Sequence, residues 1–169
     1  MALTYEAIAT VTVGSGGAAN IEFTSIPGTY TDLVVKVSAR TSVANGTCTI
    51  TFNNSTSSYS YRYIYGSGSA TSSGSASTSN IDGGVYNWSA STANTFANAE
   101  IYIPNYAGSN NKSASLDTVS ENNATEAYAD LGAGLWSNTA AITSITLTPN
   151  LGNFVQYSTA TLFGIKNTV

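Results

Sequence analysis

The segment Phe23–Arg40 reads FTSIPGTYTDLVVKVSAR, and its pattern decides the fold class. The pair Pro27-Gly28 is a strong turn signal. After this turn, the residues of Leu33–Thr41 alternate between two faces with period two, which is the pattern of a β-strand. The two faces are formed by Leu33, Val35 and Val37 on one side and by Val34, Lys36 and Ser38 on the other. The segment therefore predicts a strand that packs on a hydrophobic core.

The same alternation recurs along the chain, and turn signals such as Asn53-Asn54 separate the alternating segments. The predicted strands are Ala7–Val13, Asn20–Thr24, Leu33–Thr41, Thr47–Phe52, Tyr59–Tyr65, Phe96–Ile103, Ser113–Ser120, Ala127–Trp136, Ile142–Leu147 and Thr159–Ile165. About ten short strands separated by turns are typical of an all-β antiparallel sandwich. Asn45-Gly46 is a good hairpin turn, so Thr41 and Thr47 are expected to flank a tight connection.

Two regions do not fit this strand pattern. Residues 66–80 consist almost entirely of Ser, Gly, Ala and Thr, which predicts an exposed, mobile low-complexity loop. The segment Ile81–Trp88 is left open. With 169 residues the chain is most simply one domain. We expect a single sandwich domain over residues 7–169, preceded by a short N-terminal arm of residues 1–6.

The composition excludes several classes of function. Only 8% of the residues are charged, 42% are hydrophobic, and the net charge is −4. Nucleic acid is not expected as a partner, because phosphate binding needs clustered basic residues and the five here are scattered. No apolar run has the length of a membrane-spanning helix, and the N-terminus has no signal-peptide pattern. The chain is therefore expected to be soluble, to have no membrane partner, and not to be exported by a signal of its own.

The residues that usually carry chemistry are missing or unpaired. The chain has no histidine and a single cysteine, Cys48, which is expected to be a buried hydrophobe. Histidine-dependent triads and thiolate or histidine zinc sites are therefore excluded. Glycoside hydrolysis needs only two positioned carboxylates, but none of the nine acids forms a recognisable pair in the sequence. The two loops with calcium-like composition, 82–84 and 121–123, are better explained by turn chemistry. We expect no catalytic residue, metal or cofactor.

Aromatic residues give the strongest binding signal. Tyrosine occupies every second position of one predicted strand, at Tyr59, Tyr61, Tyr63 and Tyr65. Such a row can form a platform for sugar rings. Burial of one strand face against a second sheet also requires alternating large residues, and tyrosine is enriched at subunit interfaces, so we favour these two explanations. Trp136 is expected in the core. Trp88 lies in a polar stretch and is the better candidate for an exposed contact, together with Tyr86.

Two segments carry a resemblance to a known domain. They are Phe23–Arg40, with Ile26-Pro27 and residues 29–33, and Trp136–Ile165, with residues 141–147 and the closing Leu162-Phe163-Gly164-Ile165. They resemble the opening and closing strands of a jelly-roll-like β-sandwich found in virion structural proteins of tailed bacteriophages. The resemblance implies a non-enzymatic building part of the particle.

Among such parts, an outer capsid decoration (cement) protein fits a single compact domain without a coiled-coil shaft. The resemblance then implies a homo-oligomer, a trimer by analogy, seated on the major capsid protein at the outer surface of the virion. The expected partner contacts are Met1, Ala2, Leu3, Thr4 and Tyr5 of the arm, together with Tyr86 and Trp88. The arm could add a strand to the shell.

Two other functions stay open. The first is a tail- or fibre-associated module that binds a receptor or surface glycan through Tyr86, Trp88 and the loop to Asn94. The second is a depolymerase with paired carboxylates. The sequence does not separate a position on the head from a position on the tail.

Overall fold

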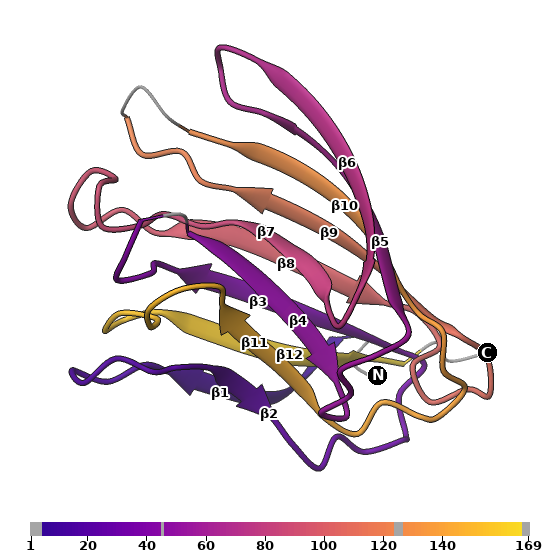
Figure 1. Cartoon of the computed structure of the whole chain (residues 1–169). Coiled ribbons are helices and arrows are strands. Elements are labelled where there is room, and N and C mark those ends of the chain that lie inside the picture. The colour runs from indigo at the N-terminus through magenta and orange to yellow at the C-terminus, as the bar shows by residue number, and fades with distance from the viewer. Residues whose placement is uncertain (1–4, 45, 124–126, 167–169) are drawn as a thin grey trace.

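The computed structural model describes residues 5–44, 46–123 and 127–166, which form twelve antiparallel strands in two sheets (Figure 1). The larger sheet contains, from edge to edge, β1 (Tyr5–Thr12), β12 (Thr159–Ile165), β3 (Asp32–Ala39), β8 (Ala97–Ile103), β9 (Lys112–Val119), β10 (Ala129–Trp136), β5 (Tyr59–Gly66) and β6 (Thr71–Thr78). The smaller sheet contains β2 (Ile21–Phe23), β11 (Ile145–Pro149), β4 (Thr47–Phe52) and β7 (Ile81–Val85). The prediction of an all-β antiparallel sandwich is confirmed.

The pairing of the strands is nested along the chain. β1 pairs with β12, β2 with β11, β3 with β8 and β4 with β7, so the first four strands run as a ribbon against four later ones. Two hairpins, β5–β6 and β9–β10, are inserted into this ribbon, and both extend the larger sheet beyond β8. The smaller sheet ends at β7, which packs against β9, β10 and β5. The hairpin β5–β6 therefore continues past the region that the smaller sheet covers (Figure 1).

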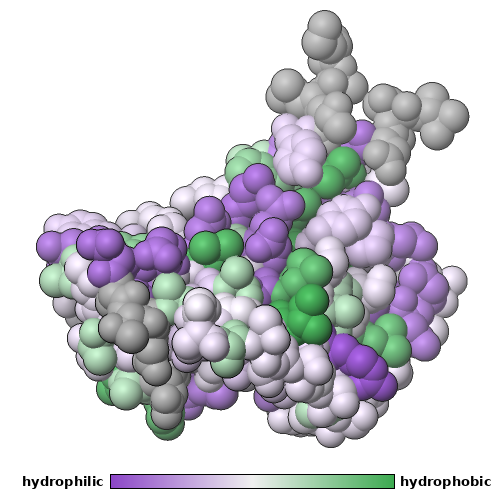
Figure 2. Space-filling view, turned by 90° about the horizontal axis from the view of Figure 1, so that it is seen from above, coloured by the Kyte–Doolittle hydropathy of each residue, from purple (hydrophilic) through white to green (hydrophobic). Residues whose placement is uncertain are grey.

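The hydrophobic core lies between the two sheets. Leu33, Val35 and Val37 of β3 are buried there, as their alternation predicts. Trp136 is also in the core, where its ring stacks on that of Tyr59 at a centroid distance of 6.0 Å. The core is hydrophobic, whereas the surface seen from above is weakly polar (Figure 2). Figure 2 shows it from above as mostly pale, with strongly hydrophilic and hydrophobic residues in small separate groups.

The low-complexity segment corrects one prediction. Residues 66–80 are not a loop, because Thr71–Thr78 form β6, which pairs with the whole of β5 without a register shift. Only a short turn joins the two strands, closed by a 2.9 Å hydrogen bond from the N–H of Ser67 to the carbonyl of Ala70. Backbone pairing with β5 holds this strand, so it needs few large side chains of its own. The exposure predicted for the segment is retained over much of β6.

The connection near Gly46 corrects a second prediction. The strands on either side of it do not form a hairpin, because β3 lies in the larger sheet and β4 in the smaller one. Thr41 bridges to Phe154, while Thr47 pairs with Val85. The chain therefore crosses between the sheets at this point, and a tight turn would not span that gap. Asn45 lies outside the described residues.

The N-terminal arm needs a partial correction. Tyr5 and Glu6 belong to β1, where they pair with Ile165 and Gly164 of β12. The strand thus begins two residues before the predicted start at Ala7, since β12 still offers backbone groups there. Met1, Ala2, Leu3 and Thr4 lie outside the described residues, so the arm prediction for them is untested.

Candidate functional site

The tyrosines of β5 become less buried along the strand. Tyr59 is buried, whereas Tyr61, Tyr63 and Tyr65 are half-buried. The three outer rings stack in sequence, with centroid distances of 6.1 Å from Tyr61 to Tyr63 and 6.0 Å from Tyr63 to Tyr65. The burial that we favoured from the sequence holds for Tyr59 alone, because the smaller sheet ends at β7 and leaves the rest of the row only partly covered.

The aromatic row continues beyond β5. The ring of Tyr65 meets that of Tyr128 edge-on at 5.6 Å, and Tyr128 meets Trp88 at 6.0 Å. The outer part of this row borders a hollow of about 260 Å³, which we call the aromatic cleft. Its lining residues are Gly46, Thr47, Tyr63, Tyr65, Asp82, Val85, Trp88, Tyr128 and Asp130. The cleft lies between the end of the smaller sheet and the β5–β10 part of the larger one.

A hydrogen-bonded loop positions Trp88 at the cleft. The N–H of Trp88 donates to the hydroxyl of Ser91 at 3.0 Å. The guanidinium of Arg40 donates to the carbonyls of Ser91, Thr92 and Thr95 at 3.0, 2.9 and 3.1 Å. Since one planar guanidinium binds three carbonyls of this loop, it fixes the loop backbone that carries the indole of Trp88.

Glycines make room for the rings. A Cβ on Gly46 would lie 3.1 Å from the Cε3 atom of Trp88 and 2.2 Å from the carbonyl oxygen of Tyr86. A Cβ on Gly74 of β6 would lie 2.5 Å from the hydroxyl oxygen of Tyr63. Trp88 therefore packs directly on the backbone before β4, and Tyr63 extends across β6.

Two carboxylates stand among these rings. One carboxylate oxygen of Asp82 accepts a 3.0 Å hydrogen bond from the N–H of Gly84. Burial raises the pKa of Asp82, and the Gly84 bond partly opposes this rise. Burial, and then the nearby negative charge of Asp82, raise the pKa of Asp130 to about 6. The structure thus brings into one cleft two acids that the sequence separates by a long interval, and sequence analysis missed this.

The predicted contact residues do not form one site. Trp88 is half-buried and lines the aromatic cleft, and its role as a partner contact stays a prediction. Tyr86 is wholly buried and packs edge-on against Phe154, so its prediction as an exposed contact is wrong. The two positions are two residues apart and would share a face on a regular strand, but β7 ends at Val85, so the chain that carries them no longer follows that alternation. Tyr5 is half exposed, but it lies on β1 at the opposite edge of the larger sheet from β6.

Tyr128, Asp82 and Asp130 are the cleft residues that sequence reasoning missed. Asp130 stands directly opposite Tyr65 across the β10–β5 pair, on the same face as the tyrosine row. The one usable signal was the predicted strand Ala127–Trp136, in which Tyr128 and Asp130 alternate onto a single face.

The loops weighed as calcium sites make ordinary turn contacts. In addition to the Asp82–Gly84 bond, a carboxylate oxygen of Glu121 accepts a 2.6 Å hydrogen bond from the N–H of Asn123. Within residues 5–44, 46–123 and 127–166, no cluster of three or more acidic or cysteine side chains could hold a metal ion. Over the same ranges, no helix is long and apolar enough to cross a membrane.

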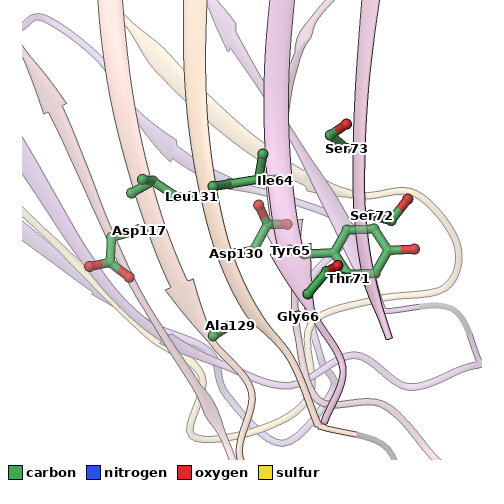
Figure 3. Close-up of a pocket in the computed structure, with 10 residues that line it drawn as sticks. All are labelled: Ile64, Tyr65, Gly66, Thr71, Ser72, Ser73, Asp117, Ala129, Asp130 and Leu131. Atoms are coloured by element: carbon green, nitrogen blue, oxygen red, sulfur yellow. The ribbon is translucent and has the colours of Figure 1, made fainter. Parts of the chain in front are cut away.

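A second hollow lies on the outer face of the larger sheet. Ile64 of β5 and Leu131 of β10 are opposite each other, and each is 57% exposed. Figure 3 shows their side chains next to each other on the face of the sheet toward the viewer, with Asp117 on the next strand and Ser73 on β6. This outer groove has a volume of about 780 Å³ and shares Tyr65 and Asp130 with the lining of the aromatic cleft, but Tyr65 is the one aromatic side chain among its described lining residues, so it lacks the gathered rings of the cleft. The cleft is therefore the better candidate site.

No protein-family model, curated protein or solved structure matches this chain.

Proposed function

We propose that this chain is a non-enzymatic carbohydrate-binding module, and that the aromatic cleft is its binding site. The observation that carries the proposal is the continuous contact from Tyr63 through Tyr65 and Tyr128 to Trp88 along a cleft that also holds two carboxylates. Aromatic rings pack on the apolar faces of sugars. Carboxylates and tyrosine hydroxyls supply the polar contacts that fix orientation.

The size of the cleft supports a small ligand. Its volume of about 260 Å³ is slightly below the roughly 300 Å³ at which pockets for drug-sized ligands begin. One sugar unit of a longer glycan suits such a space. A cleft that accepts one unit and opens to solvent suits recognition of a repeated surface polysaccharide.

The setting that we propose is a phage particle, at the tail or a fibre. The nested pairing of β1–β12, β2–β11, β3–β8 and β4–β7 is the order expected of a jelly roll, with β5–β6 and β9–β10 as inserted hairpins. Jelly rolls occur in both viral capsid and lectin domains, so this order supports a virion part that also binds glycans.

The test is a titration of the purified protein with monosaccharides of the gluco and galacto series, followed by tryptophan fluorescence and calorimetry. The proposal expects saturable binding by at least one sugar and its loss in Trp88→Ala. Binding that persists unchanged in Trp88→Ala would move the site elsewhere. If no sugar of either series binds, the carbohydrate function is wrong.

An unprotected sheet edge favours a second candidate, the capsid decoration protein. Sheet edges are usually blunted by shortness, bulges or charge. β2 is three residues long, β7 has a register shift against β4, and β1 has both a bulge and an ion pair between Glu6 and Lys166 at 3.1 Å. β6 is eight residues long, regular and uncharged. Such an edge is suited to pairing with a second copy or with a strand of the major capsid protein.

Copy number per particle separates the two candidates. Quantitative mass spectrometry of purified virions should find numbers comparable with the major capsid protein for a decoration protein, and a handful for a tail module. Absence from the particle would overturn both settings.

The pairing of the β6 edge with a second copy has its own test. Light scattering should show an oligomer that Ser75→Lys on β6 dissociates. Thr139→Lys, in an exposed loop, is the matched control and should leave the oligomer intact.

A further inference from the structure

We propose that the aromatic cleft selects a sugar that carries a free ammonium group, so that the ligand is an amino sugar in its cationic form. This inference rests on the proposed carbohydrate function and specifies the chemical class of the ligand.

None of the residues that line the cleft is basic. Each of the chain's five basic side chains lies outside the cleft lining. Lys36 pairs with Glu100, Lys166 pairs with Glu6, Arg40 binds the loop after β7, Lys112 donates to the carbonyls of Gly108 and Asn110, and Arg62 is exposed on the opposite face of β5 from the tyrosines. The two cleft carboxylates therefore have no cationic partner in the described part of the chain.

The two carboxylates of the cleft also receive few hydrogen bonds from the residues that the structure describes. An ionised carboxylate only accepts, and its two oxygens can take several donors. Within the described residues, Asp82 receives the bond from Gly84 and no bond reaches the carboxylate of Asp130. Both groups are half-buried, so water replaces the missing donors only in part. A ligand with several N–H donors and a positive charge meets this need, since charge-assisted bonds are roughly twice as strong as neutral ones.

The aromatic rings of the cleft also favour a cation. A cation close to the face of Trp or Tyr is attracted by the negative face of the ring. Trp88, Tyr128 and Tyr65 form one side of the cleft, and Asp82 and Asp130 belong to the same lining. Both sets of groups favour the same sign of charge. The carboxylates require N–H donors, which a primary ammonium group has and a quaternary ammonium group lacks.

The cleft offers a simple response to pH. Within the described residues, the titratable groups that face the two acids are Tyr61, Tyr63 and Tyr65 of β5, Cys48 of β4, and Tyr86 and Tyr128. Tyrosine and cysteine ordinarily titrate above pH 8. Among these described groups of the cleft, only Asp82 and Asp130 change charge below that pH. Affinity for a cationic sugar should therefore fall as the pH is lowered from 7 to 5, while affinity for a neutral sugar should not.

The experiment compares glucosamine, N-acetylglucosamine and glucose, and the matching galacto series, by calorimetry at pH 7. We expect the free amine to bind about tenfold more tightly or better than its two neutral relatives. In Asp130→Asn this preference should shrink while weak neutral binding persists. Asp117→Asn, on the outer face of β9, is the matched control and should keep the preference.

The possible results distinguish failure of the amine selectivity from failure of carbohydrate binding. Equal affinity for amine and neutral sugars, or a preference that survives Asp130→Asn, would overturn the inference and leave carbohydrate binding standing. Choline that binds as tightly as glucosamine would also overturn it, because N–H donors would then be unnecessary. If none of the sugars binds, the carbohydrate function itself fails.

Discussion

The hydroxyl of Tyr59 satisfies both backbone groups of Phe52. It accepts a 2.8 Å hydrogen bond from the Phe52 N–H and donates one of 3.2 Å to the Phe52 carbonyl. Phe52 ends β4 of the smaller sheet, and Tyr59 begins β5 of the larger one. A single buried side chain therefore ties the two sheets together next to the core residue Trp136, on which its ring stacks.

Replacing this tyrosine should be costly. In Tyr59→Phe the ring stays and the Phe52 carbonyl keeps its 2.9 Å hydrogen bond from the N–H of Ser55, but the buried Phe52 N–H loses its partner, so we expect a loss of about 1–3 kcal/mol in the free energy of unfolding. Urea denaturation measures it. Tyr63→Phe on the same strand is the control, because no hydrogen bond to its hydroxyl is found within the described residues, and it should change stability by less than about 0.5 kcal/mol. Similar losses in both variants would refute the role given to Tyr59.

Trp88 should matter for binding more than for folding. Its truncation to alanine removes one end of the aromatic row, and we expect at least a tenfold loss of sugar affinity. Because the side chain is only half-buried, stability should fall by about 1–2 kcal/mol. Tyr157→Ala removes an aromatic ring that is 69% exposed and does not line the cleft, and it should leave binding unchanged. Fluorescence in a Trp136→Phe background would report on Trp88 alone.

Asp130 should make the protein less stable at neutral pH. Its pKa rises from 3.8 to about 6 on folding, so the folded state holds the proton more tightly than the unfolded state. The free energy of unfolding therefore decreases as the pH rises through about 4 to 6, and the loss is complete above that range. Asp130→Asn should remove this dependence and raise stability at pH 7.5 by about 1 kcal/mol, a value that allows for partial solvent screening.

Thermal melts between pH 3.5 and 8 test this expectation. Glu22→Gln is the control, since this exposed acid lies on β2, away from the cleft. The interpretation fails if Asp130→Asn leaves the slope between pH 4 and 6 as steep as in the parent. The same variant should weaken binding of glucosamine, so one change should stabilise the fold and impair the site.

Gly46 should be required for the shape of the cleft. A Cβ there meets the backbone carbonyl of Tyr86, which cannot move as a side-chain tip would, so Gly46→Ala should cost about 1–3 kcal/mol. It should also displace Trp88 and reduce sugar affinity. Gly28→Ala is the matched control, because nothing lies within 4 Å of its Cβ position. Unchanged melting and binding in Gly46→Ala would show that the contact relaxes easily.

Local patterns predicted most of the strands. Thr47–Phe52 and Thr159–Ile165 were predicted with the bounds that the structure has, because alternation and turn residues act within a few positions. β6 was missed because its strand conformation depends on backbone bonds to β5 and not on hydrophobic side chains. Lys112 illustrates a similar limit. It counts as one scattered basic residue in the sequence, yet it is fully buried, with its ammonium group bonded to two turn carbonyls.

The sequence by itself determined the all-β class, the alternating faces and the absence of histidine chemistry, since each follows from residue type and short-range spacing. Only the tertiary structure decided the site. Asp82 and Asp130 meet because β7 of the smaller sheet packs over β10 of the larger one, and Trp88 joins them because Arg40 fixes its loop. Tyr86 is buried and Trp88 lines the cleft because the packing of the two sheets decides which side chain is covered. Contacts between residues far apart in the chain depend on how the two sheets pack, and no local pattern encodes that packing.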